Sequence, residues 1–574
     1  MPLVKSRHVC KNYPLRPRKY LQLVEAYRDD TGKAKHRTVA TLGRLDQVAG
    51  DLDSVISGLL KASGRSPELL SQAVPSIEFE TARALGDVWA LSELWETLGF
   101  GELRRVFTKT RHTTDVEALI RVMVFNRLCD PDSKLGVLRW LETIAMPGVA
   151  IEAITHQQLL RSMDALMDHQ EAVDAVVAGL LRPLIDQDLS VVFYDMTTIR
   201  AEGLSSVDDD LRKYGMAKEG LIARQFMLGV VQTGEGVPIY HEVSTGNTAE
   251  SPTLLPTLQT VLTRFPAIRR VILVADRGLL SLDNLEALSA IKLQSGEPLE
   301  FVLAVPGRRY SEFVDLLTPF HAEHCQGAKD EVIDELPWKD LRLVVAHDPE
   351  TATLMREARQ AKMTDLEAKA AAWVGKLDAQ DEGQKSRGKK RSDSGAKARF
   401  YHEVKDSRLA HILRVDLKSE LFAYTIDEKS LALAELMDGK LLLVTNSPDL
   451  SPPEVVRRYK SLADIERGFR VLKSEIEIGP VFHRRPDRIR AHASICFLAL
   501  ILYRVMRQRL SAAETGLSPE RALDQLRRIQ QHQIRINKQS NPINGISKLS
   551  NLHHRVFAAL ELKKPTQPQQ LSLL

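Results

Sequence analysis

The sequence predicts an α/β fold, with a core built on a mixed sheet flanked by helices and interrupted by an insertion domain. An α-helical N-terminal region, preceded by a small β-hairpin unit, comes before this core. Two observations predict this organisation. Short apolar runs separated by turn signals alternate with amphipathic helical segments over roughly residues 190–510. The chain of 574 residues also exceeds the size at which a single hydrophobic core usually stops growing, so we expect several domains or large insertions.

The N-terminal part carries the hairpin signal. Residues 20–42, YLQLVEAYRDDTGKAKHRTVATL, contain two alternating runs joined by the turn-forming residues 29–32. We therefore expect a β-hairpin unit within residues 1–60. Residues 75–188 change to helical spacing, as in VEALIRVMVFNRL, with almost no strand candidates, which predicts an α-helical region.

The sheet of the core is expected to begin in residues 189–307. Three apolar runs, SVVFYD, QFMLGVVQ and VPIYHEV, follow one another, and Gly234 and Gly236 mark a tight turn between the second and third. These runs predict an antiparallel meander. A helix at about 251–265 then leads to the run VILVAD, which ends at Asp276. Three strands, a helix and a further strand are the order of a ribonuclease-H-like sheet.

Residues 308–438 interrupt this scheme and are interpreted as an insertion domain. They contain a charged helical stretch, the basic linker GQKSRGKKRSDSG and β-like pieces such as LRLVVAH. The second part of the core is expected at residues 439–510, with the run LLLVTN, a helix at about 453–474 and an apolar helix at about 490–509. Residues 511–574 are interpreted as a helical tail.

Composition bounds the function only loosely. The formal net charge is +4, from 79 Lys and Arg against 75 Asp and Glu, so only local basic clusters can indicate a nucleic-acid partner. Four scattered cysteines without a CxxC pair suggest neither a zinc site nor a disulfide framework. The longest apolar run, residues 495–503, is far shorter than a membrane span, and the N-terminus lacks the apolar stretch of a signal peptide. We therefore expect a cytoplasmic protein.

Two aspartates end apolar runs of the predicted sheet. Asp195 and Asp276 each follow a strand, where rigid backbone supports a side chain that projects from the core. Two such carboxylates on neighbouring strands can share metal ions, because Mg²⁺ prefers oxygen ligands and keeps several waters. Taken singly, either aspartate is more often a cap of the next turn.

A third carboxylate, Glu466, lies on the predicted helix RRYKSLADIERGFRVLKSE. Because each helical residue turns the chain by about 100°, Tyr459, Glu466 and Lys473 are expected in one line, with Arg470 on the same side. A carboxylate flanked by cations suits metal binding beside a phosphodiester. The alternative is a surface ion pair between Glu466 and Arg470, worth about a few tenths of a kcal/mol.

Basic residues are dense around this helix. They are Arg457, Arg458, Lys460, Arg467, Arg470, Lys473, His483, Arg484, Arg485, Arg488, Arg490 and His492. Such a cluster would follow a phosphate backbone and bind it with salt-dependent affinity. A solvated helix face is the alternative explanation.

These blocks, in this order, resemble the DDE transposases of the insertion-sequence-four superfamily. The resemblance is closest to the insertion-sequence-sixteen-thirty-four group, which has an N-terminal β-hairpin. YDMTT at 194–198 is similar to the first-aspartate motif and VADRGLLS at 274–281 to the second. The resemblance spans roughly residues 20–510, and it implies an insertion domain that is mostly β before the glutamate helix.

The third block of that family has the signature Y-(2)-R-(3)-E-(6)-K. Its tyrosine, glutamate and lysine are matched by Tyr459, Glu466 and Lys473. Leu462 stands where the family usually has arginine, which leaves the phosphate contact of that arginine to Arg458 or Arg470.

The resemblance implies a nuclease and strand transferase that acts on double-stranded DNA. Asp195, Asp276 and Glu466 would be the catalytic residues and hold two Mg²⁺ ions, for which Mn²⁺ can substitute. The enzyme would cleave at the terminal inverted repeats of an insertion sequence and transfer the 3′ ends into target DNA. It would act as a homodimer on the bacterial nucleoid. Residues 511–574 lie beyond the resemblance, and DNA binding and dimerisation are both open for them. The residues expected to contact DNA are Tyr459, Arg458, Arg470, Lys473, Arg277, His483 and Arg488.

Two other functions remain open at this point. An aspartyl-phosphate phosphatase would use Asp195 as nucleophile, but Thr197 stands where such enzymes have a second aspartate. A repressor descended from a transposase would bind DNA and leave it intact. Retention of all three carboxylates argues against that loss of activity.

Overall fold

The structure of the chain is a computed structural model. It describes residues 3–7, 19–44, 77–108, 114–182, 192–203, 209–216, 222–249, 251–266, 270–275, 282–293, 295–383, 392–536 and 542–566. The chain divides into two compact units. The first comprises Met1–Ala82, Gln531–Ile546 and Pro568–Leu574, and the second comprises Arg83–Gln530 and Ser547–Gln567.

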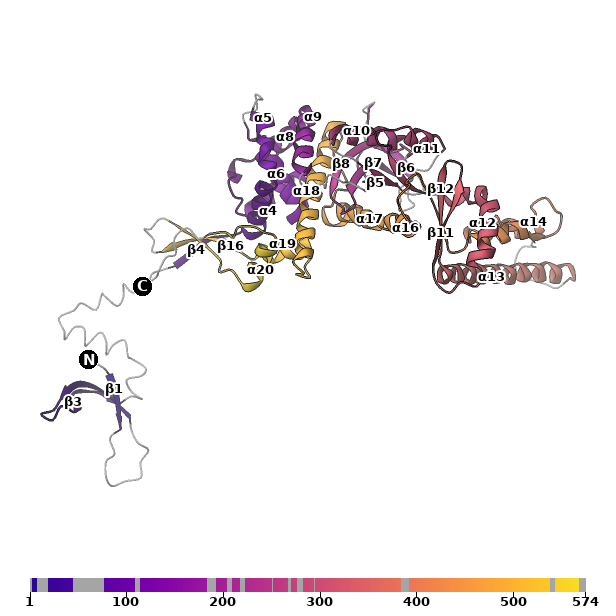
Figure 1. The fold of residues 1–574 in the computed structure, drawn as a ribbon. Coiled ribbons are helices and arrows are strands. Elements are labelled where there is room, and N and C mark those ends of the chain that lie inside the picture. Colours follow the sequence, from indigo (N-terminus) through magenta and orange to yellow (C-terminus); the bar gives the residue numbers. More distant parts are fainter. Residues whose placement is uncertain are drawn as a thin grey trace, which may run out of the picture. The chain divides into compact units, whose positions relative to one another are not determined.

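The first unit contains the predicted hairpin. Strands β1 (Leu3–Arg7), β2 (Lys19–Arg28) and β3 (Ala34–Arg44) form an antiparallel sheet in the order β1-β2-β3 (Figure 1). The β2–β3 turn is closed by hydrogen bonds from Gly32 N to Asp29 O (2.8 Å) and from Asp29 N to Lys33 O (3.1 Å). Gly32 has a φ of 78°, which glycine adopts without steric cost. β1 was not expected, because the five residues LVKSR give no clear alternation.

A second three-stranded sheet has the order β17-β16-β4 and differs from the predicted helical content. It contains β4 (Ile77–Ala84), β16 (Gln530–Ile536) and β17 (Ile543–Ile546). The expected helical region therefore begins with a strand, because IEFETARA alternates apolar and polar side chains. The expected helical tail also contains two strands. The sequence QQHQIRI has too few apolar residues to signal a strand, and it becomes one by pairing.

Helices make up the first part of the second unit, as predicted. They are α4 (Gly86–Thr97), α5 (Leu103–Thr108), α6 (Val116–Cys129), α7 (Lys134–Thr143), α8 (His156–Asp168) and α9 (Gln170–Leu181). Polar side chains begin several of them. Asp115 accepts a hydrogen bond from Ala118 N at α6, and Thr155 and Gln158 form a capping box at α8.

A long helix from later in the chain lies at the centre of this group of helices. α18 (Pro486–Ala512) packs against α6 and α8, and α19 (Pro519–Arg527) packs against α4 and α20 (Asn551–Ala559). Among the described helices, α18 alone is long and apolar enough to cross a membrane by length and composition. Because 94% of its most apolar window is buried inside the fold, α18 is a core helix here.

A nine-stranded mixed sheet is the centre of the second unit as far as it is described (Figure 1). Its strands are β5 (Val192–Arg200), β6 (Lys213–Met216), β7 (Ile222–Thr233), β8 (Pro238–Thr245), β9 (Ile272–Ala275), β10 (Glu300–Ala304), β11 (Val332–Trp338), β12 (Leu341–His347) and β15 (Lys440–Thr445). The order is β11-β12-β15-β10-β9-β5-β7-β6, and β8 also pairs with β7. The predicted meander is confirmed, since β7 is antiparallel to both β5 and β8. β9 is parallel to both β5 and β10.

Helices cover this sheet. α10 (Leu254–Arg264) connects β8 to β9, as predicted, and packs against β8 and against α11 (Leu282–Ser289). In Figure 1, α10 and α11 lie above the sheet, and α16 (Pro452–Lys460) and α17 (Ala463–Arg470) lie below it.

The segment expected as an insertion is more helical than the resemblance implied. Its helical elements are η5 (Gly307–Phe313), α12 (Val314–Phe320), η6 (His321–Cys325), α13 (Pro349–Asp381), α14 (Asp393–Asp406) and α15 (Glu428–Met437). Among the described residues of this segment, β13 (Leu413–Val415) and β14 (Tyr424–Ile426) are the strands that form a separate two-stranded sheet. β11 and β12 extend the main sheet instead, because the apolar run of β12 pairs with β15. α13, α14 and the small sheet share a core around Phe400.

Candidate active site

β5 holds Asp195 in the middle of the main sheet. The strand pairs with β7 along its whole length, and with β9 over Val192–Tyr194. The prediction that Asp195 ends its strand was wrong, because pairing with β7 continues to Arg200. The pairing of β5 with β9, by contrast, is described only as far as Tyr194, the residue before Asp195. Asp195 is half-buried between buried neighbours, and its Oδ1 accepts a hydrogen bond from Met196 N (2.7 Å).

β9 leads directly to the second predicted aspartate. The strand ends at Ala275, and Asp276 and Arg277 lie outside the described residues. The last parallel pair between β5 and β9 joins Tyr194 and Ala275. Each of these two residues immediately precedes one of the two predicted catalytic aspartates.

The helix expected at 453–474 is divided into three segments. They are α16 (Pro452–Lys460), α17 (Ala463–Arg470) and the π-helical turn η7 (Val471–Glu475). The break follows α16 at Ser461, whose Oγ donates a hydrogen bond to the carbonyl of Arg458 (2.7 Å). Such bonds from a serine to its own helix commonly bend or end it.

This break separates the three signature residues. Tyr459 belongs to α16, Glu466 to α17 and Lys473 to η7. The prediction that they form one line on a single helix was therefore wrong. The backbone of Glu466 is helical, and its side chain lies outside the described part of the chain.

α17 packs against β5, the strand of Asp195. Gly468 lets α17 lie close to the side chains of Gln232 on β7 and Arg504 on α18. A Cβ at this position would lie 2.8 Å from Gln232 Nε2 and 2.9 Å from Arg504 Nη2. The next residue, Phe469, is buried and gives this helix an apolar contact with the fold. The local sequence thus holds the backbone of Glu466 against the sheet.

The chain after η7 returns to the end of β5. Val481 N donates a hydrogen bond to Arg200 O (3.0 Å), and Glu202 N donates one to Val481 O (2.9 Å). These bonds form a parallel bridge between Val481 and Ala201. The segment with Glu466 is therefore anchored to β5 by packing and by backbone hydrogen bonds. No sequence pattern predicted this second anchor, because it is a single isolated bridge.

The predicted phosphate contacts near Glu466 differ in their surroundings. Arg458 donates to Glu454 Oε1 (2.8 Å), an ion pair within α16. Arg470 is exposed at the end of α17, and Lys473 is half-buried in η7. The three side chains therefore differ in their exposure to a DNA backbone, and Arg470 is the most exposed of them.

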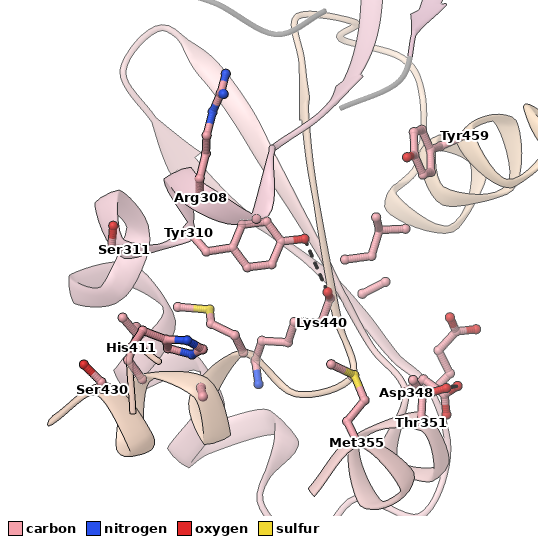
Figure 2. A pocket seen from close by; sticks show the side chains of 18 of the residues that line it. Arg308, Tyr310, Ser311, Asp348, Thr351, Met355, His411, Ser430, Lys440 and Tyr459 are labelled. Carbon is pink, nitrogen blue, oxygen red and sulfur yellow. Dashed lines mark hydrogen bonds between the residues drawn. The ribbon is translucent and has the colours of Figure 1, made fainter. Parts of the chain in front are cut away.

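Tyr459 lines a cavity of about 780 Å³ that the sequence analysis did not predict. Figure 2 shows Tyr459 at one side of it, with Tyr310, Lys440 and His411 also at the wall. The lining comes from η5, β12, α13, α15, β15 and α16. Segments this far apart in the chain carry no common local motif.

Arg488 and His483, the other two predicted DNA contacts in the described part of the chain, interact with the rest of the fold. Arg488 on α18 forms a bidentate pair with Asp164 on α8, with both hydrogen bonds at 2.8 Å. Burial, assisted by the charge of Lys134, lowers the pKa of His483 to about 4. His483 is therefore neutral at pH 7. A role of either residue in DNA binding stays a prediction.

Two protein-family models match the chain. Residues 7–72 match the IS1634 family transposase, N-terminal domain, and residues 186–502 match the transposase DDE domain. The second match contains β5, β9 and α17, and it covers more than half of the 574 residues. A search of the curated proteins found no match.

Proposed function

Since the chain belongs to the DDE transposases of the IS1634 group, which act on DNA and generally use divalent metal ions, we propose that Asp195, Asp276 and Glu466 hold those ions. The proposed reaction is Mg²⁺-dependent cleavage at the terminal inverted repeats of an insertion sequence. Transfer of the 3′ ends into target DNA follows. Mn²⁺ is proposed to substitute for Mg²⁺.

The parallel pairing of β5 with β9 is the observation that carries this proposal. Val192–Tyr194 pair with Leu273–Ala275 at a constant offset of 81 residues (275 − 194 = 81). The same offset separates Asp195 from Asp276 (276 − 195 = 81). One further step of this ladder would bring the two aspartates side by side. Neighbouring strands are about 4.8 Å apart, a spacing at which two carboxylates can share a metal ion.

The strand order supports a ribonuclease-H-like core. The meander β5-β7-β8 is followed by α10 and then by β9 and β10, which continue the sheet from β5 in parallel. In space the order is β8-β7-β5-β9-β10. We assign residues 189–307 and 439–510 to this core, with residues 308–438 as the segment that interrupts it.

The packing of α17 on β5 supports the assignment of Glu466. A helix held against the strand of Asp195 can supply a third carboxylate beside that aspartate. Glu475 and Glu477 are acidic too, but they follow α17 rather than belonging to it.

The three carboxylates fit hard divalent ions, because Mg²⁺ and Mn²⁺ prefer oxygen donors. Such ions, when bound, stabilise the attacking and leaving oxygens of an in-line phosphoryl displacement. Asp195 contributes a carboxylate on a backbone that is paired with β7 at Asp195 itself and with β9 up to Tyr194. Arg470 and Lys473 contact phosphates next to the cut, and Tyr459 and Arg458 contact them further along α16.

The remaining parts of the chain have proposed roles in binding DNA ends. The N-terminal unit and the helical region 75–188 recognise the terminal inverted repeats, and residues 511–574 bind DNA or a second subunit. A homodimer holds two ends together. We place this reaction in the bacterial cytoplasm, on the nucleoid.

The test is cleavage of a DNA duplex that carries the ends of the encoding element, with Mg²⁺ present. Asp195→Asn, Asp276→Asn and Glu466→Gln remove charge with little change in shape, and we expect each to lower cleavage by about a thousandfold or more. Glu475→Gln is the matched control and should cleave like wild type. DNA binding is measured on the same samples by fluorescence anisotropy and should remain in all four variants.

Other results would assign another function. Wild-type binding without cleavage would indicate a repressor, and hydrolysis of a small phosphomonoester without DNA would indicate a phosphatase. Full activity of Glu466→Gln together with inactive Glu475→Gln would contradict the assignment of the third carboxylate.

A further inference from the structure

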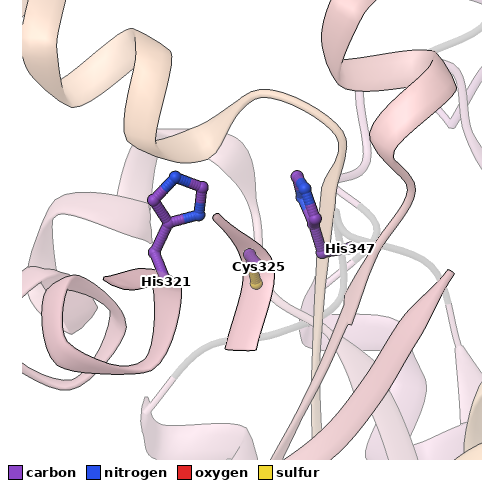
Figure 3. Close-up of side chains that lie close together, drawn as sticks. All are labelled: His321, Cys325 and His347. Carbon is purple, nitrogen blue, oxygen red and sulfur yellow. The ribbon is translucent and has the colours of Figure 1, made fainter. Parts of the chain in front are cut away.

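A second set of metal-ligating side chains lies in the outer part of the main sheet. His321 and Cys325 lie on the π-helical turn η6, and His347 is the last residue of β12. One ligand atom from each residue lies within 4.8 Å of those of the other two. Figure 3 shows the three side chains, with Cys325 between the two histidines in that view.

These side chains would select a different ion from the carboxylates of the proposed active site. Imidazole nitrogen and thiolate sulfur are donors for zinc and similar transition metals, whereas Mg²⁺ takes oxygen donors. Tetrahedral Zn²⁺ lies about 2.0 Å from nitrogen and about 2.3 Å from sulfur, which puts its ligand atoms about 3.5 Å apart. Side-chain rotations that move these atoms by about 1 Å would reach that geometry.

The burial of His347 is an independent sign that its ring can bind a ligand. This side chain is 4% exposed, and its Nδ1 is buried without a hydrogen-bond partner. Buried polar atoms are nearly always paired, so this unpaired ring nitrogen has a lone pair or proton that an ion or a water can bind. Cys325 is also buried, and its thiol is free of any disulfide. His321 is partly exposed and provides access from solvent.

Lys440 competes with a metal ion for this cluster. Its Nζ lies 2.9 Å from His321 Nδ1, at hydrogen-bond distance. An ammonium group there occupies the imidazole lone pair and repels a cation. Lys440 also lines the cavity of Figure 2, which gives its flexible side chain room to move away. Metal binding and the contact between Lys440 and His321 should therefore exclude each other.

We propose that His321, Cys325 and His347 bind one Zn²⁺ ion, with water as the fourth ligand. The ion would join η6 to the end of β12 and stabilise the outer part of the sheet, because it binds the folded chain and not the unfolded one. This site is additional to the proposed transposase centre and does not depend on it.

The test uses the full-length chain with Asp195→Ala, which weakens the carboxylate site, so that bound transition metal reports on the cluster. After loading with Zn²⁺ and desalting, we expect about one Zn²⁺ per chain by atomic emission. Co²⁺ in its place should give a thiolate-to-cobalt charge-transfer absorption. Cys325→Ser should abolish that absorption and, like His321→Gln, weaken Zn²⁺ binding on the order of tenfold or more.

Two further variants sharpen this test. Lys440→Met removes the competing ammonium and should tighten Zn²⁺ binding, which a cluster with a purely packing role would not do. Cys496→Ser is the matched control, because Cys496 is buried with its Sγ 3.7 Å from His492 Nε2, yet it belongs to no group of three such ligands among the described residues. It should retain the absorption.

The proposal is overturned if the chain gives no cobalt–thiolate absorption, or if Cys325→Ser binds Zn²⁺ as tightly as its parent. The cluster is then hydrogen-bonded packing. Because no DNA is present in these measurements, their outcome is separate from that of the cleavage test.

Discussion

Two sets of proposed metal ligands lie at the inner strands of the main sheet and beside its outer strands, and they are of different chemical kinds. Asp195 on β5 and Asp276, the residue after β9, each stand at the end of an apolar run, so each is visible in the sequence by itself. In the outer part, His321, Cys325 and His347 stand on no common motif, and only the pairing of β12 beside η6 brings them together. The comparison teaches that a ligand set can be predicted when every ligand has its own local signal, and not when tertiary packing assembles it.

The first prediction separates the stability of the region formed by α13, α14 and the small sheet from DNA cleavage, which is proposed to occur at the inner strands. Phe400 is fully buried in the core of α13, α14 and the small sheet, so Phe400→Ala should cost about 3–5 kcal/mol of unfolding free energy. Hydrogen exchange should show lost protection in α13 and α14 and unchanged protection in β5 and β7. Tyr401→Ala, at an exposed neighbouring position, is the control. Lost cleavage with intact protection would mean that the outer region takes part in catalysis.

The second prediction concerns how α17 is held on the inner strands. Gly468→Val places side-chain atoms where the ends of the Gln232 and Arg504 side chains now lie, and because both side chains are buried and have little room to move, α17 should shift relative to β5. A displacement of about 1 Å at a catalytic group can cost about a hundredfold in rate, and we expect that loss in cleavage with DNA binding retained. Gly179→Ala is the control, because a Cβ there meets open space. Unchanged cleavage by Gly468→Val would contradict the role of this close approach.

The third prediction is a pH dependence that arises beside the inner strands. His241 on β8 stacks on Phe497 of α18, and burial, with a smaller effect of Arg264, lowers its pKa to about 3. The folded state keeps His241 neutral while the unfolded state takes up a proton below about pH 6.5, so stability falls as the pH falls from 6.5 towards 3. At pH 5 this linkage amounts to about 2 kcal/mol.

Urea unfolding of wild type and His241→Gln at pH 7.5 and pH 5 measures this linkage. The variant should lose less stability between the two pH values than wild type does. Equal losses in both proteins would show that His241 titrates alike in the folded and unfolded chains.

The inner sheet was largely predictable because its strands are continuous apolar runs. β5, β7 and β8 are neighbours in space, and only the short strand β6 separates β5 from β7 in the sequence, so their meander followed from the runs and the turn at Gly234 and Gly236. The extent of β5 beyond Asp195 was missed, because Thr197 and Thr198 belong to no apolar run and become strand by pairing with β7.

Other features depend on interactions that a local pattern does not contain. The helical periodicity continues through Ser461, so the break between α16 and α17 was invisible, although it decides where Glu466 lies relative to Tyr459. The run of β12 was recognised as β-like, but its partner β15 comes after the whole of α13, α14 and α15. Strands that are this far apart in the sequence pair because the packing of the whole core brings them together, and a local pattern does not contain that information.

The most direct test of the central claim is metal rescue of a cysteine variant. Asp195→Cys places a thiolate where the carboxylate is proposed to hold a metal ion, and thiolates bind Mn²⁺ and Cd²⁺ better than Mg²⁺. We predict that Asp195→Cys is inactive in DNA cleavage with Mg²⁺ and regains activity when Mn²⁺ or Cd²⁺ is supplied, while Asp195→Ala stays inactive with all three. Full activity of Asp195→Cys with Mg²⁺, or rescue of Asp195→Ala to the same level, would contradict a direct contact between Asp195 and the metal.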